Sequence, residues 1–188
     1  MISIMMPPLS LAQIRGSAAR LRNILGIPED SYVDIVKIMD NLPDTFGVVV
    51  EIVPVQEMGE KHGETYPVAK KIRLREDVYD RACQGYGRDR LTLAHELAHL
   101  ILHGPKKIAL ARVSENTRVP AYCDSEWQAN AFAGEFLAPY RFARAMTEQA
   151  IQSKYGVSAA AAHVQKNRGI ISLCGEIPSL LSSFIIPW

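Results

Sequence analysis

Residues 90–103 of the chain read RLTLAHELAHLILH. Leucine, isoleucine and alanine fall on every side of this run when it is wound as an α-helix, and a helix that is apolar all round is buried. Gly104-Pro105 ends the run, and Asp89 is expected to cap its start. We therefore predict a central, buried helix over residues 90–103.

Two histidines, His95 and His99, stand four residues apart in this helix. Positions i and i+4 share one helix face, about 6 Å apart along the axis, so both imidazoles can bind one ion in the HExxH pattern. Glu96 is rotated about 100° from His95 and lies beside the ion, where it can take a proton from a water that the ion activates. The pattern predicts a metal site with Glu96 as the catalytic base.

The alternative is that these residues have no ligand. A buried apolar helix is an unfavourable place for two histidines and a glutamate without partners, which favours the metal site. His103 lies about 12 Å from His95 along the axis, too far to share the ion, and is predicted to bond carbonyl groups at the helix end. His62 and His163 are interpreted as surface or packing residues.

A zinc site needs a third protein ligand, with one position left for water. Residues 124–138 are predicted to form a helix rich in small residues, which can pack closely on residues 90–103. Asn130 of this helix can hydrogen-bond a ligand histidine through the outer nitrogen of its ring. The acidic candidates for the third ligand are Glu115, Asp124, Glu126 and Glu135.

The other segments predict an α+β fold, a helix-rich domain with a small β-sheet packed on the active-site helix. Helices are expected at 10–25, 32–39, 140–154 and 158–168. Strands are expected at 46–53 (buried), 68–74 (half-exposed) and 108–113 (short), with a polar turn at 59–67. The prediction is a single domain over residues 1–188, with a core of about 28–168 and an apolar tail, 169–188, of unknown role.

The composition argues for a soluble, cytoplasmic protein. With 21 Lys+Arg against 20 Asp+Glu, the chain lacks the basic field that draws nucleic acid or membrane surfaces, so neither is an expected partner. Three scattered cysteines fit a reducing compartment. The N-terminus has no basic segment typical of a signal peptide, and Glu176 and Pro178 interrupt the apolar tail, so no membrane span is expected.

The sequence resembles the ImmA/IrrE-type metallo-endopeptidases. The resemblance rests on HELAHLILH at 95–103 and EWQANAFAGEFLAP at 126–139, with REDVY at 75–79 and GRDR at 87–90 leading in. Weaker similarity extends from about residue 35 to 166. The resemblance implies a zincin-like fold, with His95, His99 and Glu126 as ligands of Zn²⁺ (Mn²⁺ is possible) and Glu96 as the base.

Helix phase favours the same glutamate. Glu135 lies nine residues beyond Glu126, about 180° around the helix, so both cannot face one ion. Asp124 sits at the expected N-cap, and Glu115 in an expected loop. Glu126 shares its face with Asn130.

The resemblance also implies a substrate class. Members of the family cleave helix-turn-helix (Xre-like) repressors, often encoded beside the peptidase, and so derepress a phage, mobile-element or stress operon. Some relatives instead pair with such a repressor as toxin and antitoxin. The sequence gives no prediction for the oligomeric state, and it leaves the oxyanion-stabilising group open among Tyr122, Tyr140, Tyr155 and His163.

Two other functions compete with peptidase. Residues 148–168 have the outline of a helix-turn-helix, but its second helix begins Ala159-Ala160-Ala161-Ala162 and offers little to base edges, so packing is favoured. The other is a metal-holding protein that sequesters a repressor without cutting it. It would carry the same ligands as a peptidase.

Overall fold

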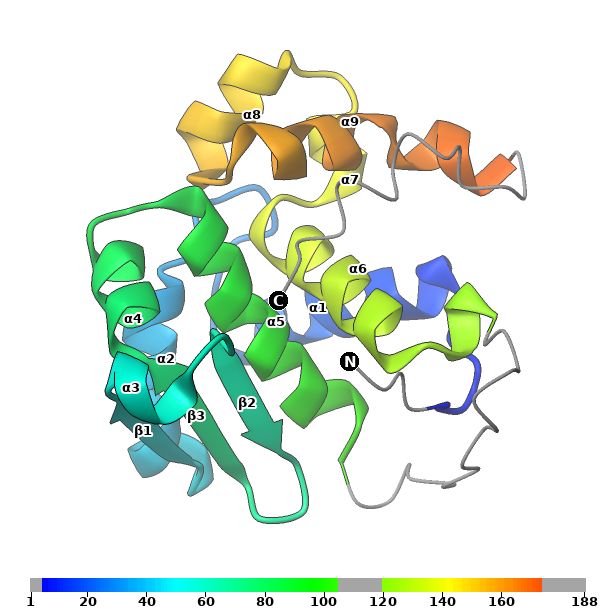
Figure 1. Ribbon diagram of the computed structural model, residues 1–188. Helices are drawn as coiled ribbons and strands as arrows, with labels where there is room; N and C mark the ends of the chain where they lie inside the picture. Colours follow the sequence, from blue (N-terminus) through cyan, green and yellow to red (C-terminus); the bar gives the residue numbers. More distant parts are fainter. Residues whose placement is uncertain (1–4, 105–119, 174–188) are drawn as a thin grey trace.

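The computed structural model describes residues 5–104 and 120–173. Helix α5 (Gly87–Leu102), in green at the centre of Figure 1, contacts the sheet on one side and helix α6 on the other. Every residue from position 89 to 98 is buried. The prediction of a central buried helix is confirmed. Its N-cap is Tyr86, however, and Asp89 lies in its first turn.

Within residues 5–104 and 120–173 the sheet has three short strands in the order β1-β3-β2. Strand β3 (Lys71–Arg75) lies in the middle, parallel to β1 (Val49–Val53) and antiparallel to β2 (Gly63–Tyr66). Ile72 and Leu74 of β3 are fully buried and alternate with partly exposed basic residues, as expected for a half-buried strand. Strand β2 lies against α5 and so faces the predicted metal site.

Three helices accompany the sheet. Helix α2 (Ile35–Phe46) contacts β1 and α5, and α4 (Glu76–Cys83) contacts β3 and α5. The short helix α3 (Val55–Met58) connects β1 to the segment that leads into β2. Together with the sheet they cover one side of α5 (Figure 1).

Helix α6 (Ser125–Leu137) covers the other side of α5, and α1 (Leu11–Ile24) packs on α6. A short 3₁₀ turn, η2 (Ala121–Cys123), precedes α6. Asp124 caps α6 by accepting hydrogen bonds from the main-chain N–H groups of residues 126 and 127, which confirms the predicted helix start. Small residues on α6 are fully buried, which permits close packing: Ala129, Ala131 and Ala133.

The last three helices, at the top of Figure 1, are α7 (Tyr140–Ala143), α8 (Glu148–Tyr155) and α9 (Ala159–Leu173). Two buried or half-buried side chains attach α9 to the body. Gln165 Nε2 donates to the oxygen of Ala138 at 2.7 Å, and Arg168 Nη1 donates to the oxygen of Ala131 at 3.3 Å. These contacts join α9 to helix α6 and to the residue that follows it.

The structure corrects several of the predicted elements. The helix at 32–39 is α2, which begins at Ile35 and ends at Phe46, and the strand at 68–74 is β3, which begins at Lys71. The polar turn at 59–67 contains strand β2, whose sequence GETY lacks the apolar alternation of an ordinary strand. The strand at 46–53 is shorter and lies at a sheet edge, with Val49 and Ile52 exposed, while Phe46 ends helix α2. The helix at 140–154 is two helices, because Thr147 caps a new one. The helix at 158–168 continues to Leu173.

Helix α4 was not predicted, and the strand expected at 108–113 lies outside the described residues. None of the helices within 5–104 and 120–173 has both the length and the apolar character needed to cross a membrane.

Candidate metal centre

Three of the predicted ligand side chains meet between α5 and α6. The Nε2 atoms of His95 and His99 lie 2.9 Å apart. The carboxylate of Glu126 approaches both, with Oε2 at 3.3 Å from His95 Nε2 and Oε1 at 3.5 Å from His99 Nε2. One donor atom from each residue falls in a group whose members all lie within 4.8 Å of one another.

The other acidic candidates lie elsewhere or outside the described residues. Asp124 is occupied as the N-cap of α6. Glu135 accepts hydrogen bonds from Arg15 Nε at 3.0 Å and from the main-chain N–H of Tyr140 at 3.1 Å, so it links α6 to α1 and α7. Glu115 is outside the described part of the chain. Among the described candidates, Glu126 is the carboxylate that reaches the histidines.

The donor set fits a tetrahedral divalent ion. Metal–ligand bonds of about 2.0–2.1 Å in a tetrahedral site place neighbouring donor atoms about 3.3 Å apart. The observed separations of 2.9, 3.3 and 3.5 Å lie around this value. Two imidazole nitrogens and one carboxylate are also the protein donors of one kind of catalytic zinc site, in which water takes the fourth position.

The ionisation of Glu126 suits a cation. Burial disfavours its charged form, but the imidazoles of His95 and His99 beside it outweigh burial and hold the pKa of Glu126 well below its usual range. The side chain is therefore an anion over the ordinary pH range, as a metal ligand must be.

The outer ring nitrogens of both histidines have partners. His95 Nδ1 lies 3.1 Å from Asn130 Oδ1, the contact expected from the sequence. His99 Nδ1 lies 3.0 Å from His103 Nδ1, and His103 Nε2 lies 3.0 Å from Gln128 Oε1. His103 is thus the C-cap residue of α5, as its position suggested, but its ring bonds side chains rather than carbonyl groups at the helix end.

Glu96 is placed by strand β2. The hydroxyl of Thr65 donates to Glu96 Oε2 at 2.6 Å and lies 3.0 Å from the main-chain oxygen of Glu96. Gly63 lets the strand pass close by, because a Cβ atom at this position would lie 2.7 Å from both Cγ and Oε1 of Glu96. Burial raises the pKa of Glu96 to about 7, while the nearby His99 and the Thr65 hydroxyl act in the opposite direction.

Sequence patterns missed several residues at this site. Gly63 and Thr65 belong to no motif, and Gln128 stands within the stretch at 126–139 without a predicted role. Only a glycine within a strand hints at a close backbone approach. Of the residues considered for oxyanion stabilisation, Tyr155 bonds Asp30 through its hydroxyl, and His163 contacts Glu148 at 2.9 Å.

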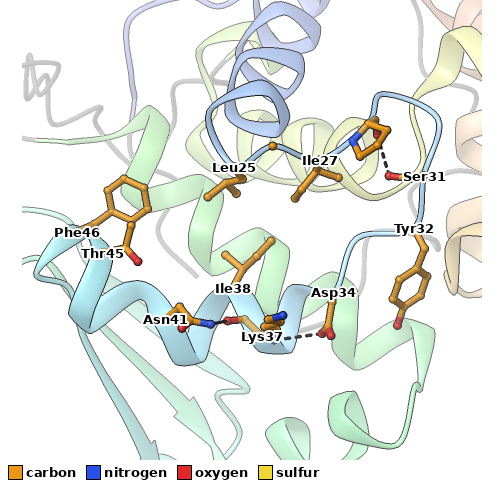
Figure 2. Close-up of a pocket in the computed structure, with 12 residues that line it drawn as sticks. Leu25, Ile27, Ser31, Tyr32, Asp34, Lys37, Ile38, Asn41, Thr45 and Phe46 are labelled. Atoms are coloured by element: carbon orange, nitrogen blue, oxygen red, sulfur yellow. Dashed lines mark hydrogen bonds between the residues drawn. The ribbon is translucent and has the colours of Figure 1, made fainter.

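A hollow of about 390 Å³ lies away from these residues, between helix α2 and the segment that follows α1 (Figure 2). Its polar groups bond their own segment: Ser31 Oγ donates to the oxygen of Pro28, and Asn41 Nδ2 to the oxygen of Lys37. The hollow shares no lining residue with the histidine–glutamate cluster, so it is not part of the candidate centre.

Comparison with known proteins gives a family match and a likeness of fold to solved structures. The family profile described as Peptidase_M78, IrrE N-terminal-like domain, matches residues 43–165, which include every residue of the candidate centre. A solved structure titled Mycobacterium tuberculosis transcriptional regulator is 19% identical with a TM-score of 0.52, covering 82% of this chain and 46% of that one. The chain therefore spans under half of that protein, and the likeness concerns the fold alone. No curated protein matches the chain.

Proposed function

The chain belongs to the M78 peptidase family, described as the IrrE N-terminal-like domain, and on this premise we propose that it is a zinc-dependent endopeptidase. The observation that carries the proposal is the meeting of His95 Nε2, His99 Nε2 and the Glu126 carboxylate beside Glu96. His95, His99 and Glu126 would hold the ion, zinc by donor type, with manganese as the alternative.

Each residue around the proposed ion would have a separate role in peptide hydrolysis. When bound, the ion would supply Lewis acidity that acidifies water and polarises the scissile carbonyl. Glu96 takes a proton from the attacking water on its carboxylate and returns it to the nitrogen of the leaving amine. Thr65 orients Glu96 by donating to Oε2. Asn130 holds the ring of His95 through Nδ1, which leaves Nε2 directed toward His99 and Glu126, where it would bind the ion.

The position of strand β2 supports the proposal that the substrate is a peptide. In the described part of the chain the sheet order is β1-β3-β2, which places β2 at an edge with Glu96 beside it. An extended peptide can add to such an edge through main-chain hydrogen bonds. This arrangement would bring a substrate strand alongside the base without a deep cleft.

The proposed substrate is a helix-turn-helix repressor, by resemblance to the ImmA/IrrE-type peptidases. Its cleavage would derepress the genes that the repressor controls. We place this reaction in the cytoplasm, where a repressor works and where the free Cys83 and Cys123 would stay reduced.

The test is incubation of the purified protein, with zinc or manganese, against the helix-turn-helix repressor encoded nearest to it. We expect discrete fragments by mass spectrometry, and casein digested far more slowly. Glu96→Gln should lower the cleavage rate by about a hundredfold to ten-thousandfold while keeping the metal, because this residue moves protons and does not ligate.

Two outcomes would contradict the proposal. One is a Glu96→Gln protein that cleaves at the wild-type rate. The other is relief of repression by Glu96→Gln to the full wild-type extent without fragments, which would indicate a metal-holding protein that sequesters the repressor.

A further inference from the structure

A series of buried polar side chains leads from His99 away from the candidate metal centre. His99 Nδ1 lies 3.0 Å from His103 Nδ1, and His103 Nε2 lies 3.0 Å from Gln128 Oε1. Gln128 Nε2 donates to the main-chain oxygens of Pro7 at 3.0 Å and Tyr122 at 2.8 Å. His103 is 5% exposed and Gln128 is fully buried, so bulk water competes little for these hydrogen bonds.

The two carbonyl groups fix the orientation of the Gln128 amide. A carbonyl oxygen only accepts, so the NH₂ end of the amide must face Pro7 and Tyr122, and the oxygen must face His103. The amide oxygen also only accepts, so His103 Nε2 carries a hydrogen. A neutral imidazole has one N–H, which leaves His103 Nδ1 as an acceptor.

This order determines the tautomer of His99. Because His103 Nδ1 accepts, His99 Nδ1 carries the hydrogen and donates it. His99 Nε2 is then left with a free lone pair, 2.9 Å from His95 Nε2 and 3.5 Å from Glu126 Oε1. A lone pair at this position is what a metal ion requires of a histidine ligand.

We propose that His103 and Gln128 are positioning residues, which hold His99 in the tautomer and orientation that bind metal; this inference rests on the metal site of the proposed function. His95 is held directly, by Asn130 Oδ1. His99 is held indirectly, through His103 and then Gln128. Gln128 is fixed in turn by the main-chain oxygens of Pro7 and Tyr122. Pro7 lies outside the matched residues 43–165, so the N-terminal segment takes part in holding the centre.

The same contacts argue against His103 as a ligand. Its Nδ1 is engaged by His99 and its Nε2 by Gln128, so neither nitrogen is available to an ion. The cluster of potential ligands in the described residues accordingly contains His95, His99 and Glu126 without His103.

The first test reads the tautomers directly in the wild-type, metal-free protein. Long-range ¹H–¹⁵N spectra of the imidazole rings are recorded well above the ordinary histidine pKa of about 6.5. We expect the hydrogen on Nδ1 of His99 and on Nε2 of His103. A hydrogen on Nε2 of His99 would overturn the inference, and no substitution is needed to see it.

The second test measures zinc affinity by competition with a chromogenic chelator. His103→Leu and Gln128→Leu should each weaken zinc binding by about 10- to 100-fold, the usual effect of losing an outer partner of a ligand histidine. His103→Asn should stay within a few-fold of wild type, because its Oδ1 can replace Nδ1 as the acceptor. His163→Leu, a histidine on α9 that contacts Glu148, should change nothing.

Each outcome decides the inference. Folded His103→Leu and Gln128→Leu proteins with wild-type zinc affinity would overturn it. If the leucine variants do not fold, the His103→Asn variant and the wild-type spectra decide instead. A folded His103→Asn protein that binds zinc more than tenfold more weakly than wild type would count against the role of His103 Nδ1 as an acceptor. A wild-type protein that binds no metal would contradict the proposed function, while its ring tautomers still test the order of hydrogen bonds.

Discussion

At the scale of single residues, two glutamates of helix α6 make different contacts. Glu126 faces His95 and His99, whereas Glu135 is buried and bonds Arg15 Nε and the main-chain N–H of Tyr140. Nine residues separate them, which is about half a turn in helix phase. The helix therefore directs the carboxylate of Glu126 to the two histidines and that of Glu135 to α1 and α7.

The pair Glu126→Ala and Glu135→Ala tests this assignment. Glu126→Ala should weaken zinc binding by more than about 100-fold, beyond the loss caused by outer partners. Glu135→Ala should keep zinc affinity within a few-fold. It should lower the free energy of unfolding by about 1–3 kcal/mol, a modest cost because the partner Arg15 is one-third exposed. Zinc titration and urea denaturation of both variants give the two readouts. The reverse pattern of zinc loss would show that the helix phase is wrong.

At the scale of elements, strand β2 and helix α5 build the catalytic position together. Helix α5 supplies Glu96, but Thr65 of β2 binds its carboxylate and Gly63 of β2 leaves space for it. The helix alone would leave the glutamate without orientation. The close approach of the strand is therefore part of the site rather than only of the fold.

Gly63→Ala tests the contribution of the strand. The added Cβ would lie 2.7 Å from Cγ and Oε1 of Glu96, closer than such atoms approach, so Glu96 or the strand must shift. A shift of about 1 Å at a reacting group can cost about a hundredfold in rate. We expect a loss of cleavage of this order with zinc affinity nearly unchanged.

The matched control is Gly16→Ala in helix α1. A Cβ there meets nothing within 4 Å, so cleavage should be unaffected and stability equal or slightly higher. Wild-type cleavage by Gly63→Ala would show that the strand does not set the position of Glu96.

The elements also show how far the sequence predicts this structure. Helices α1, α5 and α6 were predicted because each has a long run with apolar residues at helical spacing. Gly26 marks the end of α1, Gly104-Pro105 the end of α5, and Asp124 the start of α6. Strand β2 was missed because its sequence, Gly-Glu-Thr-Tyr, carries no period-two apolar signal, and the hydrogen-bond partner of its Thr65 is a glutamate on another element. Helix α4 was missed because it is short and highly charged.

The residues of the candidate site also differ in whether the sequence predicts them. The spacing of His95, Glu96 and His99 lies within one helix, so the sequence predicts that they share a region of its surface. The contacts of Thr65 with Glu96 and of Gln128 with His103 join segments 31 and 25 residues apart. Contacts of this kind depend on how the elements pack, and no local pattern encodes them.

At the scale of the whole molecule, buried arginines hold the outer helices to the centre. Arg22 of α1 is 1% exposed and donates to the oxygens of Phe136 and Leu137, the last residues of α6. It also donates to the oxygens of Pro28 and Ser31. Arg90 of α5 similarly donates to the oxygens of Val33 and Gly156. These guanidinium groups satisfy carbonyl groups that would otherwise be buried without donors.

Arg22→Met tests how much this attachment contributes. Several buried carbonyl groups would lose their donor, at about 1–3 kcal/mol for each that stays unsatisfied. We expect the free energy of unfolding to fall by about 2–5 kcal/mol in urea denaturation. Arg20→Met, an exposed arginine of the same helix, should change it by no more than about 0.5 kcal/mol. Equal effects of the two substitutions would mean that the buried hydrogen bonds of Arg22 add little to stability.

The central claim is that His95, His99 and Glu126 hold one divalent ion in each chain, and elemental analysis tests it most directly. Protein purified without added metal should contain about one zinc-like ion per chain, and a chelator should remove it. The double variant His95→Ala, His99→Ala, if folded by circular dichroism, should contain almost none. An unchanged metal content in that folded double variant would contradict the claim.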